Sequence, residues 1–412
     1  MAIDASPVLL DIDGLGALID QLHADGREVY GPVVRQGAIQ TGSLRSVADL
    51  PRGWRDEQAP GRYRVTEDPT PARFAWAVGP QTWKPLLHPP RVRTVTIRRR
   101  GTTVDADGER VTRGGAGELE IRPEPQPPRR LALFGLRPCD LAAIERLDRV
   151  LGEGVAAEPV YAARRRDAFL VVVECTAPAD TCFCTSMGTG PGIDESSPPH
   201  DLTLTELVDG DEVRYLARPV SDAGARVLAA ATADVATADV DTADVDTADV
   251  DTAVTTPAAV DDARAAVAAA ATSIRRRLDG SGLPETLIAA HDHPVWDEIA
   301  DRCLACGNCT AVCPTCFCTD LNDTTDLSGT TAERWRTWAT CYDPEFSRLG
   351  ARLVRSSTMS RYRQWLTHKL ATWHDQFGQS GCVGCGRCIT WCPVGIDLTV
   401  EVDALAASGA AP

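Results

Sequence analysis

Two stretches of the chain share one spacing of cysteines. The first is Cys303-Leu-Ala-Cys306-Gly-Asn-Cys309-Thr-Ala-Val-Cys313-Pro314, and the second is Cys382-Val-Gly-Cys385-Gly-Arg-Cys388-Ile-Thr-Trp-Cys392-Pro393. Both read C-x2-C-x2-C-x3-C-P, the bacterial-type run of ligands for a [4Fe–4S] cluster. Three thiolates spaced by two residues can wrap a cubane from one tight loop. The glycine after the second cysteine of each run allows left-handed backbone and close approach of amides to the cluster.

The spacing also predicts which cysteines share a cluster. In proteins with two such runs, the fourth cysteine of one run binds the cluster of the other run. We therefore expect two [4Fe–4S] clusters. The ligands of the first are Cys303, Cys306, Cys309 and Cys392, and those of the second are Cys382, Cys385, Cys388 and Cys313. The rival is zinc, but zinc sites usually take two separated pairs of ligands and do not explain three cysteines per loop.

The function class follows from these ligands. Iron atoms that are all bound by cysteine have no open coordination site, so such clusters pass single electrons and bind no substrate. The sequence contains no G-x-G-x-x-G, no P-loop and no H-E-x-x-H motif. We therefore expect no catalytic residue, and no nicotinamide, flavin or nucleotide site, in this chain. Partner proteins would hold those sites.

Composition excludes other classes. The chain has 412 residues and a formal net charge of −16, which argues against a nucleic-acid binder. It has no uncharged apolar run long enough to cross a membrane. The first residues, Met1-Ala-Ile-Asp-Ala-Ser, carry an acid where a signal peptide needs basic residues. Fifteen cysteines, an odd number, do not describe a disulfide scaffold, so we expect a cytoplasmic protein that uses its cysteines as ligands.

An acidic repeat divides the chain. Residues 232–251 repeat Thr-Ala-Asp-Val with a five-residue period, which matches neither a helix nor a strand. We interpret it as a disordered spacer, with an acidic docking tail as the alternative. The expected organisation is an α+β domain over 1–222, a linker over 223–256, and an all-α, helical-ferredoxin-like domain over 257–412 that binds both clusters.

Seven further cysteines lie outside the two runs. Apolar segments 131–135 and 168–173 predict buried strands, and Cys139 and Cys175 follow them. If the two strands are neighbours, both thiols lie at strand ends, where α/β proteins place their sites. Together with Cys182 and Cys184 they would suit a third [4Fe–4S] cluster; the alternative is a set of reduced, buried cysteines. Cys316, Cys318 and Cys341 receive no role.

Beyond the runs, several segments resemble the iron–sulfur β subunit of group 3 (sulfhydrogenase, NADP-linked) [NiFe]-hydrogenases, a family that includes the corresponding subunit of anaerobic sulfite reductase. The segments that carry the resemblance are Gly79-Pro-Gln-Thr-Trp-Lys84, Gly135-Leu-Arg-Pro-Cys-Asp140, Cys182 to Pro191, Cys303 to Cys318, Arg355 to Leu370 and Gly381 to Asp397. The acidic spacer lies outside the family pattern.

The resemblance implies an electron-transfer subunit with two [4Fe–4S] clusters. Its partners would be a flavoprotein that binds NAD(P) and a catalytic hydrogenase subunit. The alternative is the corresponding subunit of an anaerobic sulfite reductase, with a sirohaem partner. A third hypothesis, from another class, is a structural zinc protein.

Overall fold

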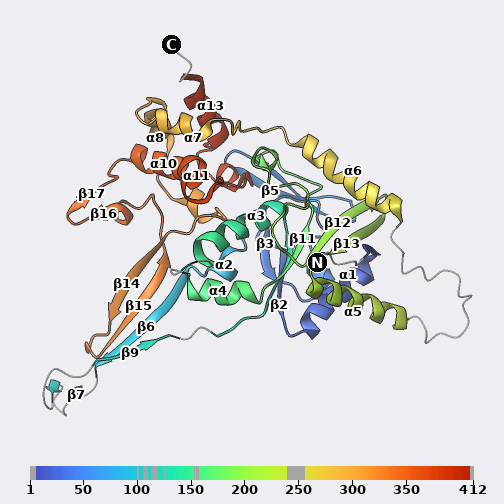
Figure 1. Ribbon diagram of the computed structural model, residues 1–412, viewed down its shortest axis with the longest axis horizontal. Helices are drawn as coiled ribbons and strands as arrows, with labels where there is room; N and C mark the ends of the chain where they lie inside the picture. Colours follow the sequence, from blue (N-terminus) through green and yellow to red (C-terminus); the bar gives the residue numbers. More distant parts are fainter. Residues whose placement is uncertain are drawn as a thin grey trace, which may run out of the picture.

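A computed structural model describes residues 6–99, 102–104, 110–112, 119–124, 127–152, 154, 157–238 and 256–408 (Figure 1). Its largest sheet has seven strands. In spatial order they are β1 (Val8–Leu10), β13 (Glu212–Pro219), β12 (Leu202–Asp209), β11 (Phe169–Val173), β10 (Leu131–Leu136), β2 (Glu28–Arg35) and β3 (Ala38–Ser43). The four strands from β12 to β2 run parallel, and the three outer strands are antiparallel to their neighbours.

The two predicted buried strands are β10 and β11, and they pair directly in parallel with every residue buried. A parallel pair needs a crossover connection. Here α3 (Pro138–Leu147), the π-helical turn η2 (Asp148–Gly152) and α4 (Pro159–Arg166) lie between the strands. Cys139 and Cys175 therefore follow the ends of adjacent strands, as predicted. Strands β12 and β13 form a hairpin around Asp209-Gly210.

Helices cover both faces of this sheet. Alternate residues of β10 and β11 pack on one side with α1 (Ile12–Ala24) and α5 (Asp222–Ala238), and on the other side with α3 and α4. Crossover helices on both faces of parallel strands make an α/β domain. The expected α+β class of this domain is therefore wrong, and the observed class is α/β. The sequence did not reveal the whole helical connection between β10 and β11.

The expected linker over 223–256 is also only partly correct. Residues 222–238 form α5, whose Val227, Leu228 and Ala231 are buried in the core beside α1. Apolar burial thus stabilises a helix whose end runs into the acidic repeat. Residues 239–255 of the expected linker lie outside the described residues. The next described helix, α6 (Pro257–Ser273), begins at the predicted proline, and the Thr256 side chain accepts a hydrogen bond from the Ala259 amide.

The expectation of an all-α C-terminal domain is wrong. A second sheet has the order β14 (Thr319–Thr325), β15 (Thr331–Trp338), β6 (Arg91–Arg99) and β9 (Leu119–Pro123). The hairpin β14–β15 therefore belongs to the cysteine-rich half, and it pairs with strands of the N-terminal half, as Figure 1 shows. A strand pairing across more than 200 residues leaves no trace in local periodicity, which is why the sequence did not indicate it.

Three two-stranded ribbons complete the strands. They are β4 (Trp54–Ala59) with β5 (Arg62–Glu67), β7 (Thr102–Val104) with β8 (Arg110–Thr112), and β16 (Arg348–Leu349) with β17 (Arg352–Leu353).

The remaining C-terminal elements are short helices around one apolar core. They are α7 (Leu283–Ala289), α8 (Val295–Arg302), α9 (Asn308–Ala311), α10 (Thr358–Thr367), the π-helical turn η6 (His368–Thr372), α11 (Trp373–Phe377), α12 (Arg387–Thr390) and α13 (Leu398–Ser408). The run α10–η6–α11 has an apolar face, and its Tyr362, Trp365, Leu366 and Leu370 are buried against α7, α8 and α13. Among the described residues, no helix has both the length and the apolar character needed to cross a membrane.

Candidate functional site

The two cysteine runs fold into loops with matching backbone. The glycine after the second cysteine has a positive φ in both, 73° at Gly307 and 74° at Gly386, and it begins the short helix that carries the third cysteine. The residue before the second cysteine also has a positive φ, 49° at Ala305 and 63° at Gly384. Left-handed backbone at two positions turns each loop inward, so the first three sulfurs of a run can face one space.

The first of these spaces, which we call the first cysteine cavity, is lined by the four cysteines predicted to share a cluster. They are Cys303, Cys306, Cys309 and Cys392. The second cysteine cavity is lined by the other predicted set, Cys313, Cys382, Cys385 and Cys388. The structure thus brings together, across the two runs, the cysteines that the spacing pairs. Their role as ligands stays a prediction.

The two cavities are neighbours. Cys388, Trp365 and Leu398 line both of them. The first cavity reaches the surface, because Cys306 is exposed and the side chains of Leu304 and Val394 beside it are 63% and 41% exposed. The second cavity is bounded by buried residues of the N-terminal domain such as Phe183. The two cavities together therefore extend from the surface to the boundary between the N-terminal and C-terminal halves of the chain.

Hydrogen-bond donors point at the sulfurs. The amides of Ala305 and Gly384 donate to Cys303 Sγ and Cys382 Sγ, both at 3.4 Å. The amide of Ile396 donates to Cys392 Sγ at 3.3 Å. The first two donors occupy equivalent positions of the two loops. Such bonds favour the thiolate form and set the potential of a bound cluster.

Two buried lysines flank Cys313. Lys84 Nζ donates to the carbonyl oxygens of Cys313 and Cys316, each at 3.0 Å, and lies 4.0 Å from the ring of Trp338. Lys369 Nζ donates to Thr315 Oγ1 at 2.7 Å, and this hydroxyl lies 3.3 Å from Cys313 Sγ. Sequence reasoning missed both residues. A signal was available, since the 42 basic residues of the chain include only these two lysines.

Burial and the charges of the two lysines shift the pKa values of the cysteine thiols in opposite directions. Burial raises the pKa of Cys382 to about 12 and that of Cys388 well above its usual value. The pKa of Cys313 is instead well below its usual value, because the Cys316 thiol donates to it and Lys369 and Lys84 lie close by. Burial disfavours the Lys369 cation, but the nearby sulfur groups, Cys313 before Cys316 and Cys382, outweigh burial and raise its pKa. Cation and thiolate therefore stabilise each other.

The donor sets fit [4Fe–4S] clusters. Each cavity has the four thiols of one predicted set in its lining, and buried hydrogen-bond donors lie beside them. Tyr362 Oη and Trp365 Nε1 at the first cavity, and Arg387 Nη1 at the second, have no hydrogen-bond partner among the described residues. Sulfides and thiolates would accept from such groups. No three Cys, His, Asp or Glu side chains in the described part of the chain stand close enough together to hold a single metal ion.

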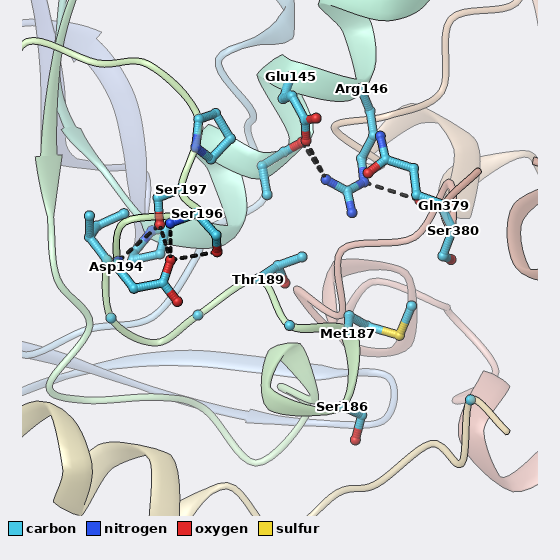
Figure 2. Close-up of a pocket in the computed structure, with 18 of the residues that line it drawn as sticks. Glu145, Arg146, Ser186, Met187, Thr189, Asp194, Ser196, Ser197, Gln379 and Ser380 are labelled. Atoms are coloured by element: carbon cyan, nitrogen blue, oxygen red, sulfur yellow. Dashed lines mark hydrogen bonds and ion pairs between the residues drawn. The ribbon is translucent and has the colours of Figure 1, made fainter. Parts of the chain in front are cut away.

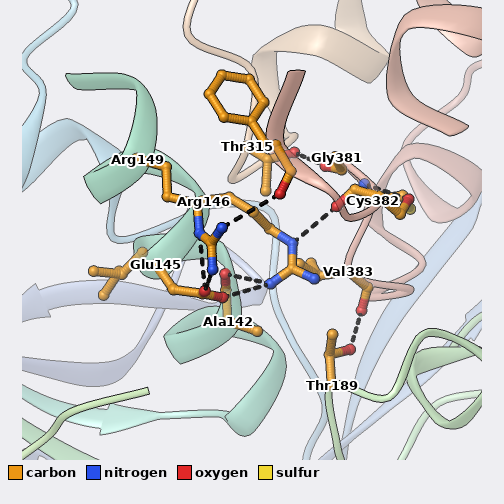
Figure 3. A network of polar contacts seen from close by, with 12 residues as sticks. Ala142, Glu145, Arg146, Arg149, Thr189, Thr315, Gly381, Cys382 and Val383 are labelled. Atoms are coloured by element: carbon orange, nitrogen blue, oxygen red, sulfur yellow. Dashed lines mark hydrogen bonds and ion pairs between the residues drawn. The ribbon is translucent and has the colours of Figure 1, made fainter. Parts of the chain in front are cut away.

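The second loop is held by several elements. Arg146 Nε of α3 donates to the Ser380 carbonyl at 3.1 Å, Thr189 Oγ1 to that of Val383 at 2.7 Å, and Thr315 Oγ1 to that of Gly381 at 2.6 Å. Figure 3 shows α3 and the 189 loop meeting the loop that carries Cys382. Three carbonyls around Cys382 are thus fixed by the N-terminal domain and by the first run, which positions this cysteine rigidly.

The N-terminal cysteines gather against the same loop. Cys139, Cys175, Cys182 and Cys184 are all buried, and burial raises the pKa of each. Cys182 Sγ lies 4.0 Å from the Cys385 carbonyl oxygen, and Cys139 and Cys184 pack with Cys385 in an apolar cluster. Their assignment to a third cluster stays a prediction, with the reduced, buried set as its alternative.

A large cavity of about 690 Å³ lies outside these sites. Figure 2 shows it between α3, the loop of residues 186–198 and residues 379–380. Arg146 reaches its wall while it holds Ser380. None of the predicted site residues lines this cavity.

Comparison with known proteins agrees with the cysteine geometry. Residues 302–396 match the family described as "4Fe-4S dicluster domain". The chain is 31% identical over 275 residues to sulfhydrogenase 2 subunit beta of Pyrococcus furiosus, an alignment that covers 66% of this chain and 73% of the relative. No solved structure matches the chain.

Proposed function

Because the chain belongs to the family of sulfhydrogenase β subunits, we propose that it is the iron–sulfur electron-transfer subunit of a cytoplasmic, NAD(P)-linked [NiFe]-hydrogenase of group 3. The observation that carries the proposal is the pair of adjoining cavities, each lined by one of the two predicted sets of four cysteines, which draw on both runs. The relative's name favours the hydrogenase role over a role in sulfite reductase.

We assign Cys303, Cys306, Cys309 and Cys392 to one [4Fe–4S] cluster, and Cys382, Cys385, Cys388 and Cys313 to the other. When bound, these clusters supply one-electron transfer. The chain's own residues keep them close together and dry. Trp365 and Leu398, both at most 4% exposed, line both cavities and exclude water from the space between them. Lys369 offsets the negative charge of the thiolates at the second cavity.

The exposed end of the path suggests where a partner docks. Leu304 and Val394 are exposed apolar side chains beside Cys306. A flavin and NAD(P)-binding subunit docked there would cover these side chains and exchange electrons through the first cavity. The catalytic hydrogenase subunit would be the second partner of the complex.

Metal content tests the ligand assignment. On the full chain, reconstituted with iron and sulfide without oxygen, we expect at least about eight iron and eight sulfide per chain. Cys306→Ser and Cys385→Ser should each lose one EPR signal and keep the other, since they belong to different cavities. Zinc without acid-labile sulfide would refute the proposal.

Activity of the complex tests the biological role. The chain should co-purify with a flavoprotein and a nickel-containing subunit, and hydrogen should reduce NAD(P)⁺ only when the chain is present. Co-purification with a sirohaem protein, and oxidation of the reduced chain by sulfite, would instead assign it to a sulfite reductase.

A further inference from the structure

A third group of cysteines surrounds a cavity of its own, about 370 Å³ in volume. Cys316, Cys318 and Cys341 line this third cysteine cavity together with His368. The cavity is partly open to solvent, since Phe346 at its wall is 39% exposed, whereas Lys369 on its inner side is buried. Three thiols and an imidazole around such a space call for a chemical explanation.

The second sheet brings these residues together. Cys318 immediately precedes β14 and Cys341 follows the end of β15, so both lie at the open end of this hairpin. The Ala339 amide donates to the Cys318 carbonyl at 2.9 Å and closes that end. His368 begins η6, directly after α10. Separate elements thus converge on one cavity, and the pairing with β6 holds the hairpin in place.

Cations balance the thiols at this cavity. Lys369 and Arg355 both line it, and Lys369 is 6% exposed. Burial raises the pKa of Cys318, and raises that of Cys341 to about 11. Thiolates formed by binding iron in this space would have these two cations beside them.

His368 can act as a neutral ligand. Burial, with the Lys369 and Arg355 cations, lowers its pKa to about 4. Within the described part of the chain its ring has no hydrogen bond, and it packs 6.1 Å from the ring of Phe317 and 6.3 Å from that of Trp373. A neutral imidazole is the form that ligates a metal.

The geometry points to an additional iron–sulfur centre in the third cysteine cavity, ligated by the thiolates of Cys316, Cys318 and Cys341 and by the imidazole of His368. The inference rests on the proposed function, because it uses the same iron and sulfide. Each thiol releases its proton to solvent when it binds iron.

Such a centre would adjoin both of the others. Cys316 donates a hydrogen bond to Cys313, which lines the second cavity. Cys341 lies close enough to Cys309, which lines the first cavity, to raise the pKa of its thiol. The chain would then store one more electron than the two paired runs allow. The partly exposed Phe346 at its wall marks a second place where electrons could leave.

The test compares the full chain with its Cys318→Ser/Cys341→Ser variant, both reconstituted with iron and sulfide without oxygen. These two cysteines lie outside the first and second cavities. We expect the variant to lose about four iron and four sulfide per chain while the EPR signals removed by Cys306→Ser and Cys385→Ser remain. Unchanged iron and sulfide would overturn the inference and leave the proposed function intact. A wild-type chain that binds no iron would instead refute the proposed function.

A second variant pair covers the case in which the double variant does not fold. His368→Gln should alter the EPR signal of the additional centre and shift its reduction potential, because the ligand type at the iron sets the potential, as imidazole in place of thiolate does in Rieske centres. His374→Gln is the matched control, since His374 is exposed on α11 and does not line this cavity. Identical spectra and potentials for the two variants would exclude His368 as a ligand and overturn the assignment.

Discussion

The guanidinium of Arg387 lies 2.9 Å from Oδ1 of Asp140, and the two side chains are only 2% and 4% exposed. Arg387 stands between two cysteines of the second run, and Asp140 follows Cys139 at the start of α3. The pair therefore joins the second cysteine cavity to the α/β domain. Burial disfavours the Arg387 cation, but Asp140 and the nearby Cys385 outweigh burial and raise its pKa.

Removal of the charge of Asp140 tests the importance of this pair. Asp140→Asn leaves a buried, uncompensated cation, which costs about 3–5 kcal/mol. Denaturant unfolding of the reconstituted chain under nitrogen measures this loss of unfolding free energy. Asp261→Asn is the control, because the Asp261–Arg264 pair is exposed and worth at most about 1 kcal/mol. Equal losses of unfolding free energy in the two variants would show that the buried Arg387–Asp140 pair contributes no more stability than an exposed ion pair.

The two motif glycines should differ in their tolerance of alanine. Gly386→Ala would place a Cβ 2.4 Å from the Thr181 carbonyl oxygen, whereas Gly307→Ala meets the Thr340 methyl at an ordinary 3.4 Å. Both variants incur about 1–2 kcal/mol of left-handed strain. Only Gly386→Ala must also move backbone, so we expect a lower melting temperature and lost iron at the second cavity alone. Equal effects would contradict the close approach of residue 181.

Loss of the Lys369 charge should lower the potential of the second cluster. One charge at about 6 Å in an effective dielectric constant of about 20 corresponds to a shift on the order of 100 mV. An EPR-monitored redox titration of Lys369→Gln measures the shift. Arg264→Gln is the control, because this arginine is exposed and its charge is screened. A Lys369→Gln potential equal to that of the control would mean that the ammonium does not act on the cluster.

The N-terminal cysteines are tested by iron content. For Cys182→Ser/Cys184→Ser we expect about four fewer iron per chain, as a third cluster requires. The first and second cavities keep all their cysteines in this variant. Iron at the wild-type level would assign the four thiols to the alternative, a reduced and buried set.

One buried histidine predicts how stability depends on pH. His200 contacts the Pro198 carbonyl at 2.9 Å and Thr203 Oγ1 at 2.7 Å, and burial lowers its pKa. The unfolded chain therefore binds a proton first, below about pH 6.5, and the stabilising contribution falls as the pH falls. The difference in unfolding free energy between the wild type and His200→Gln should shrink from pH 8 to pH 5.5. A difference that is constant over this range would exclude the linkage.

Local patterns were sufficient for several features. Strands β10 and β11 follow from their apolar runs, and α6 begins at residue 257, where the C-terminal domain was expected to start. The eight cysteines of the two runs follow from spacing, and the structure lines two cavities with the predicted sets. The hairpin β14–β15 escaped prediction because its partner β6 lies more than 200 residues away. The helix α5 escaped it because the acidic repeat obscured the buried face of Val227 and Leu228.

The sequence by itself predicted the two sets of candidate ligands, because a loop that wraps a cubane needs cysteines at short, regular intervals. Only the tertiary structure decided what surrounds them. The cysteine spacing does not single out Lys84, Lys369 or Arg387, yet the fold buries their charges beside Cys313 and Cys385. Cys316, Cys318 and Cys341 share a cavity only because a hairpin closes against a strand from the other half of the chain. Spacing is a local property, whereas burial and charge balance depend on contacts between distant segments.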